Sequence, residues 1–203
     1  MTTHVGTRLP AAERRQAILD AALRVFSEGS YRGTTTAEIA REAGVSEPIL
    51  YRHFASKRDL YLACIDEAWL RLRDAWEQTL AEGGSPAHWL PKMSGAYLAG
   101  GDAKHLVAEL WMQAVVEAGD DEEVQRFLRG HMRGVHDFVA GVIRRCQEQG
   151  VVRPERDAEA EAWIFLAGGL LGTIGRRVGG LVTQEDFRRI RACRREWMTG
   201  QSP

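Results

Sequence analysis

The segment over residues 45–60, VSEPILYRHFASKRDL, gathers side chains that can bind phosphate. Tyr51, Arg52 and His53 are consecutive hydrogen-bond donors, and Lys57 follows four residues later. Phenol, guanidinium and imidazole groups all donate to the phosphate oxygens of nucleic acids. Lys57 stands at the start of an expected helix, where free backbone N–H groups and the helix dipole already favour an anion. The segment therefore indicates a surface for a polyanion.

The same segment predicts a helix that presents its first turn to base edges. Leu50 and Phe54 are four residues apart, so we expect them to anchor the helix from its inner face. Glu47, Pro48 and Ile49 then point outward or sideways. A single helix fits the major groove of DNA with its N-terminal residues against the bases. There Glu47 can accept a hydrogen bond from cytosine, and Ile49 can contact a thymine methyl group.

Two short helices that meet through a glycine must position these side chains. Thr35 with Glu38 three residues later predicts a capping box, and Gly44 ends the helix that it opens. Ser46 is expected to cap the next helix. Thr36 offers a hydroxyl and a backbone amide to another phosphate. Two short helices joined by a turn with glycine are the outline of a helix-turn-helix motif.

Helical spacing recurs along the whole chain, and strand-like alternation is nearly absent. We therefore expect an all-α protein of about nine helices. Besides the two short ones, the pattern predicts helices over residues 11–28, 56–81, 87–99, 103–118, 121–149, 158–178 and 184–198.

Composition and charge exclude several classes of protein. Of the 203 residues, 44% are hydrophobic, which is enough for a packed core. The formal net charge is −1, but residues 1–58 hold nine Lys and Arg against six Asp and Glu. The three cysteines are far apart in sequence and form no disulfide framework or metal pair. With no signal peptide and no membrane-spanning stretch, we expect a soluble cytoplasmic protein that binds no membrane.

The stretch TTAEIAREAGVSEPILYRHFASKRDL resembles the DNA-binding core of the TetR family of bacterial transcriptional regulators. The similarity extends back over QAILDAALRVFSEGSYRGTT. It implies an all-helical homodimer, in which three N-terminal helices bind double-stranded DNA at a palindromic operator. The C-terminal helices of such a protein bind a small molecule and form the dimer. We therefore expect a DNA-binding domain over residues 11–71 and a ligand-binding and dimerisation domain over residues 72–203.

The resemblance also implies roles for single residues. Phosphate-contacting positions of the family correspond to Thr36, Tyr51, His53 and Lys57. Positions that face bases correspond to residues 47–49, and Arg52 flanks them. Some members carry an arginine just after the cap of the second helix and use it to contact guanine. Ala37 stands there in this chain, so that contact is missing and the operator sequence stays open.

Four residues of the remaining chain are candidates for contact with a small molecule: Tyr97, Trp111, His131 and Trp163. Aromatic side chains line apolar pockets, although they fill protein cores more often. A single histidine on an apolar stripe is also more often a core residue, so both interpretations stay open for His131. His131 and His136 are five residues apart and project from different faces, so they predict no metal site.

The glycine-rich stretch FLAGGLLGTIG places small residues at helical spacing. Gly168, Gly172 and Gly175 would let another helix approach closely, as small residues do at other helix interfaces. With Leu171, we expect them to form part of a dimer interface. Close packing within one subunit is the alternative.

These observations favour a ligand-responsive repressor that binds DNA as a homodimer, without a cofactor or a metal and without enzymatic activity. An activator would carry the same features. Motifs of common hydrolases and nucleotide-binding enzymes are absent from the sequence, although a helical enzyme with an apolar substrate pocket is a rival hypothesis. A regulator that acts only through protein contacts is a third.

Overall fold

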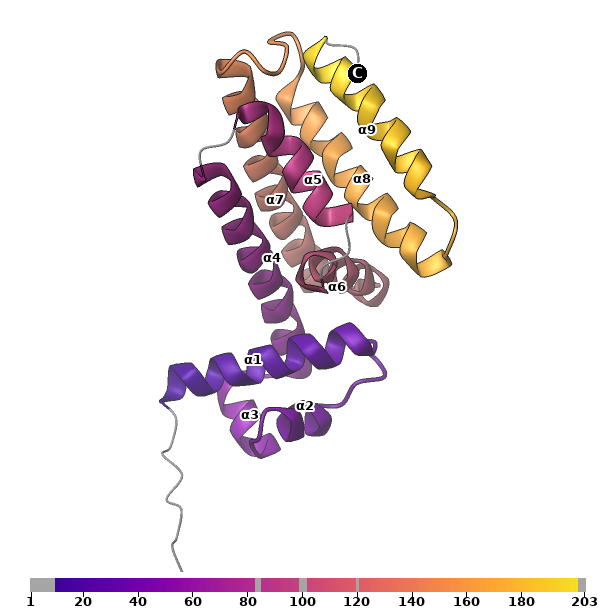
Figure 1. The fold of residues 1–203 in the computed structure, drawn as a ribbon. Helices are drawn as coiled ribbons and strands as arrows, with labels where there is room; N and C mark the ends of the chain where they lie inside the picture. Colours follow the sequence, from indigo (N-terminus) through magenta and orange to yellow (C-terminus); the bar gives the residue numbers. More distant parts are fainter. Residues whose placement is uncertain (1–9, 83–84, 99–101, 120, 201–203) are drawn as a thin grey trace, which may run out of the picture. The chain divides into compact units, whose positions relative to one another are not determined.

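A computed structural model describes residues 10–82, 85–98, 102–119 and 121–200, without the side chains of residues 94–98, 102–105 and 118. Within these ranges the chain forms nine α-helices and no strand, so the predicted all-α fold is confirmed (Figure 1). The helices are α1 (Ala11–Glu28), α2 (Thr36–Glu42), α3 (Glu47–His53), α4 (Lys57–Ala81), α5 (Trp89–Leu98), α6 (Asp102–Ala118), α7 (Glu122–Glu148), α8 (Ala158–Val178) and α9 (Gln184–Thr199). A 3₁₀ turn, η1 (Pro86–His88), precedes α5.

The chain divides into two compact units between Glu67 and Ala68. The first unit contains α1, α2, α3 and the beginning of α4. In it α1 packs on α2 and α3 (Figure 1). Phe26 is completely buried at its centre, where its ring meets the edge of Tyr61 at 4.9 Å and lies 6.3 Å from Tyr31. This small core holds the two short helices in place.

Local signals set the ends of these short helices. The capping box of Thr35 and Glu38 is present, which confirms the predicted start of α2. Gly44 turns the chain toward α3 with a φ of +66°, a conformation that costs glycine little. Ser46 is the N-cap residue of α3, as predicted, but its side chain makes no capping hydrogen bond. Pro48 has no N–H to donate, and the Ile49 N–H bonds the backbone carbonyl of Ser46 at 2.9 Å instead.

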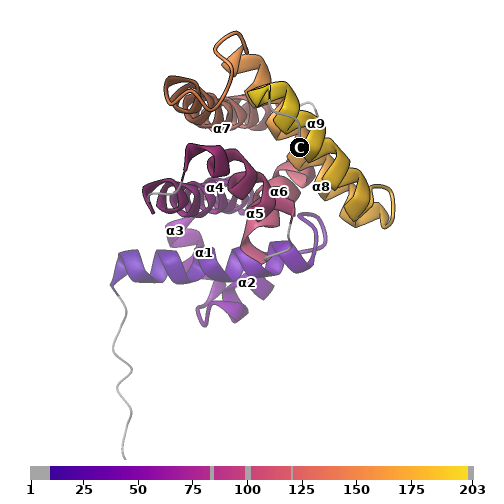
Figure 2. The same cartoon turned by 45° about the horizontal axis from the view of Figure 1, so that its top comes forward.

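The second unit is a helical bundle in which α7 packs against α8 (Figures 1 and 2). Beside α8 runs α9, tied to it through Glu161, which is only 4% exposed. The carboxylate of Glu161 accepts a hydrogen bond from Trp197 Nε1 at 2.7 Å and pairs with Arg194 Nη1 at 2.5 Å. None of the helices in the described ranges is long and apolar enough to cross a lipid bilayer.

One predicted helix differs in the structure. The expected helix over residues 87–99 begins as η1 and becomes α-helical only at Trp89. Pro91 lacks the N–H that a continuous α-helix from residue 87 would bond to the carbonyl of Ala87. Ser85 instead accepts a bond from the Ala87 N–H, which fixes the tighter turn.

Candidate nucleic-acid interface and small-molecule cavity

The outer face of α3 carries the predicted DNA contacts. Leu50 is completely buried and Phe54 is 4% exposed, as expected of the inner anchors. The opposite side of the helix is open to solvent. Its exposed side chains are Pro48, Tyr51 and Arg52, and its partly exposed ones are Glu47, Ile49 and His53. The first turn and the outer face of α3 are therefore accessible to a partner.

A hydrogen-bonded chain joins α2 to this face. The hydroxyl of Thr36 donates to the Glu47 carboxylate and lies 3.1 Å from the Tyr51 hydroxyl. Because the Thr36 proton is used on Glu47, the Tyr51 hydroxyl is the donor in the second bond. Thr36 is buried, whereas Tyr51 is 44% exposed. A phosphate contact by either hydroxyl would thus require an exchange of partners, and both contacts stay predictions.

Lys57 is the first residue of α4, and an aromatic ring supports its side chain. Its ammonium lies 4.5 Å from the centre of the Tyr31 ring. Such a cation–π contact holds the charge in place while leaving the ammonium able to donate hydrogen bonds. Nearby, hydrogen bonds from the backbone and hydroxyl of Thr35 lower the pKa of the Glu38 carboxyl, and the charge of Lys57 makes a smaller contribution in the same direction.

The second unit encloses a cavity of about 690 Å³, which lies within the range of small-molecule sites. Its wall is mostly apolar and draws on α4, η1, α5, α6, α7, α8 and α9. Trp111 and His131 line it, and the His131 ring stacks on Phe127 at 5.8 Å. Trp163 is not among the lining residues and is 47% exposed. The side chain of Tyr97 lies outside the described residues.

Apart from His131 and the arginines of α9, polar groups in this wall are few. Trp76 and Trp111 both line the cavity, and each has a buried indole N–H with no hydrogen-bond partner among the described residues. Glu161 is the one carboxylate that the described wall contains, and it is engaged by α9. Such a site suits a mostly apolar molecule.

The four residues of α8 that we expect at a dimer interface lie in two different environments. Gly168 and Leu171 line the cavity. Gly172 and Gly175 are buried within the single chain, and a Cβ on Gly175 would lie 3.5 Å from Val182. For Gly175 this placement agrees with the alternative of close packing within one subunit. The predicted dimer interface remains a prediction.

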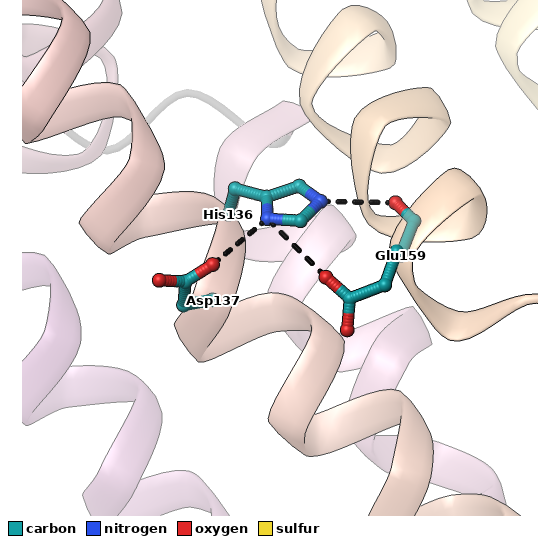
Figure 3. Close-up of side chains that lie close together, drawn as sticks. All are labelled: His136, Asp137 and Glu159. Carbon is teal, nitrogen blue, oxygen red and sulfur yellow. Dashed lines mark hydrogen bonds and ion pairs between the residues drawn. The ribbon is translucent and has the colours of Figure 1, made fainter.

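A polar cluster that the sequence did not single out links α7 to α8 (Figure 3). His136 is 6% exposed, and its Nε2 bonds the carbonyl oxygen of Glu159 at 3.0 Å. Its Nδ1 lies 3.1 Å from the Asp137 carboxylate and 3.8 Å from that of Glu159. The Trp163 ring stacks on the imidazole at 4.3 Å. Glu159 also pairs with Arg144, so ion pairs and hydrogen bonds account for the cluster, and we assign no metal to it.

The protonated form of His136 should stabilise the second unit. Burial acts to lower the pKa of His136, but the hydrogen bonds to Asp137 and to the Glu159 carbonyl, with the charges of both residues, outweigh it and raise the pKa. A raised folded-state pKa gives stability that is complete below the unfolded value of 6.5 and is lost as pH rises through the folded value.

His136→Gln should therefore cost more unfolding free energy at about pH 6 than at about pH 9. Urea unfolding followed by tryptophan fluorescence at the two pH values measures the difference. His88→Gln is the matched control, because His88 is exposed on η1 and its loss should change stability little at either pH. An equal cost of His136→Gln at both pH values would contradict the assignment.

Sequence reasoning missed Trp76 as a wall residue. Trp69, Leu72 and Trp76 follow at helical spacing on α4 and are all buried, so periodicity alone could have marked them as inward-facing. The Trp76 ring is 6.0 Å from Phe138 on α7 and 6.1 Å from Phe165 on α8. Those partners are more than 60 residues away along the chain, so no pattern of neighbouring residues predicts these contacts.

Two known families match this chain, one in each of its two units. Residues 18–64 match the family described as bacterial regulatory proteins, tetR family. Residues 86–168 match the family described as BetI-type transcriptional repressor, C-terminal. The first match covers the helix-turn-helix segment, and the second covers several helices that wall the cavity.

Individual proteins agree with these matches. The regulator BetI of Rhizobium meliloti is 31% identical over 150 residues, which span 73% of this chain and 72% of that protein. The transcriptional activator FasR of Mycolicibacterium smegmatis is 52% identical over 60 residues, 30% of this chain and 27% of FasR. A transcriptional regulator from Saccharomonospora viridis, solved in complex with choline, has the same fold with a TM-score of 0.74. It is 23% identical, and the match covers 89% of this chain and 93% of that one.

Proposed function

This chain belongs to the TetR family of bacterial regulatory proteins and is a DNA-binding transcriptional regulator, and from this premise we propose that it is a repressor released from its operator by a small molecule. The observation that carries the proposal is the presence, in one chain, of an exposed polar face on α3 and a large apolar cavity in the second unit. The match of residues 86–168 to a repressor family supports repression.

The proposed DNA contacts are those of α3 and its neighbours. Glu47, Pro48 and Ile49 face bases from the first turn of α3, where all three are at least partly exposed. The phosphate contacts come from Thr36, Tyr51, Arg52, His53 and Lys57. The DNA-binding domain comprises residues 11–71, and residues 72–203 bind the effector and form the dimer.

A homodimer is part of the proposal, because two-fold symmetry of the protein fits a palindromic operator. The far end of α8 and the turn after it expose Ile174, Val178 and Leu181. Trp197 is an exposed aromatic residue on α9. Exposed apolar side chains of this size mark a protein interface where they form a patch, and we propose that those at the end of α8 belong to the dimer interface.

Release would act through α4, which runs without a break from Lys57 to Ala81. Leu72 and Trp76 of this helix line the cavity, and Lys57 at its start is a proposed phosphate contact. A ligand that prefers a displaced α4 must weaken DNA binding, and by linkage DNA must weaken ligand binding equally. Coupling of roughly 1–3 kcal/mol gives a 5- to 150-fold release.

Fluorescence anisotropy with duplexes from the region upstream of its own coding sequence tests the proposal. We expect two chains per duplex and an affinity that falls steeply between low and moderate salt, because bound phosphates release counterions. One chain per duplex would contradict the dimer, and an affinity independent of salt would contradict the phosphate contacts. Transcription from the same promoter in vitro should fall when the protein is added. A rise would favour activation, the role that the name of FasR states for that protein.

A further inference from the structure

The size of the cavity in the second unit restricts what can fill it. At about 690 Å³ it lies in the upper half of the range of about 300–1,000 Å³ that holds drug-sized ligands. Choline, bound by the matched Saccharomonospora viridis protein, has a handful of heavy atoms and would leave most of this space unfilled. The mostly apolar wall instead favours a ligand with a long hydrocarbon part, whose burial drives binding.

Two indole N–H groups of the wall are buried and do not reach into the cavity. Trp76 is 2% exposed, and its N–H is buried without a hydrogen-bond partner among the described residues. The N–H of Trp111 is in the same state, and both residues line the cavity. Because neither nitrogen has accessible surface, an acceptor in the cavity does not contact it, and the polar part of the ligand must bind elsewhere on the wall.

The charges of the wall distinguish an anionic ligand from a cationic one. The single carboxylate of the described wall, Glu161, already faces the guanidinium of Arg194. Arg191 and Arg195 of α9 also line the cavity, and neither has an ion-pair partner among the described residues. This excess of positive charge repels a quaternary ammonium group and attracts a carboxylate.

We propose that the effector of this cavity is an amphipathic carboxylate, with a hydrocarbon chain along the apolar wall and its carboxylate beside Arg191 and Arg195. The inference rests on the proposed function, because it names the ligand class of the site through which release would act. It differs from what the choline complex of the matched structure would suggest.

Two probes with the same chain and opposite charge test the inference directly. Dodecanoate and dodecyltrimethylammonium are titrated into the full-length protein by calorimetry, below the concentrations at which either forms micelles. Dodecanoate should bind at least tenfold more tightly. Equal binding of the two probes, tighter binding of the cation, or binding of neither would overturn the proposal.

A pair of matched variants tests the placement of the carboxylate. Arg191→Gln should weaken dodecanoate binding about tenfold, since hydrogen bonds to charged groups have that order of effect. Arg133→Gln is the control, because Arg133 is an exposed residue of α7 that does not line the cavity. Unchanged dodecanoate affinity in Arg191→Gln, or the same loss in Arg133→Gln, would contradict this placement.

A DNA readout separates the failure of this inference from the failure of the proposed function. A labelled operator duplex is followed by anisotropy while dodecanoate is added. If dodecanoate binds with the expected preference but leaves DNA bound, the release mechanism is wrong and the ligand class stands. If the protein binds DNA tightly and dodecanoate does not bind to it, the ligand class is wrong and the DNA-binding assignment stands.

Discussion

Replacing Tyr51 with phenylalanine and Lys57 with alanine in the same chain should weaken operator binding roughly 100- to 1,000-fold. Each chain loses a phenolic donor and an ammonium, and the proposed dimer carries both changes twice. The apparent affinity is measured by anisotropy over a series of salt concentrations. The slope of log affinity against log salt should flatten by about two, because two lysine–phosphate contacts are lost per dimer.

The two changes should cost only a small part of the folding stability, although each removes one contact. The Tyr51 side chain is 44% exposed, and Lys57 contacts the Tyr31 ring from a partly exposed position. Arg126→Ala is the control for net charge, because Arg126 is an exposed residue of α7 in the second unit. It should alter affinity only a few-fold. A double variant that binds as tightly as the parent, with an unchanged salt slope, would remove Tyr51 and Lys57 from the interface.

Replacing Phe26 with alanine should destabilise the first unit by about 3–5 kcal/mol. Phe26 is completely buried and its ring touches Tyr61, so its removal takes apolar area from the core and leaves a void. Phe26→Leu keeps most of that volume and should cost about 1.5 kcal/mol or less. Urea unfolding followed by far-UV circular dichroism measures both losses.

The positions of the tryptophans allow the effect to be assigned to one unit. All six tryptophans, at positions 69, 76, 89, 111, 163 and 197, lie after the division at Glu67. If the units unfold separately, tryptophan fluorescence should report an unchanged transition in Phe26→Ala while the dichroism transition moves to lower urea. An unfolding free energy within about 1 kcal/mol of the parent would show that Phe26 is not the central residue of this core.

Most of the helices, and the family, could be predicted from short-range patterns in the sequence. Thr35 with Glu38 and the spacing of Leu50 and Phe54 are signals within a few residues of one another, and the structure has the helices that they predict. Capping and helical periodicity act over one or two turns, so a local pattern carries them completely. The outward face of α3 followed from the same spacing, because the buried anchors leave only one side free.

Which residues meet around the cavity depends on how helices that are distant in sequence pack together. Trp111 and Trp163 are equivalent in sequence terms, yet one lines the cavity and the other stacks on His136 at the surface. Trp76, which no local signal connected with a ligand, lies in the wall with its N–H unpaired among the described residues. The environment of such side chains is set by helices far away along the chain. Packing between distant helices, which periodicity does not encode, determines which residues line the cavity and which partner each polar group has.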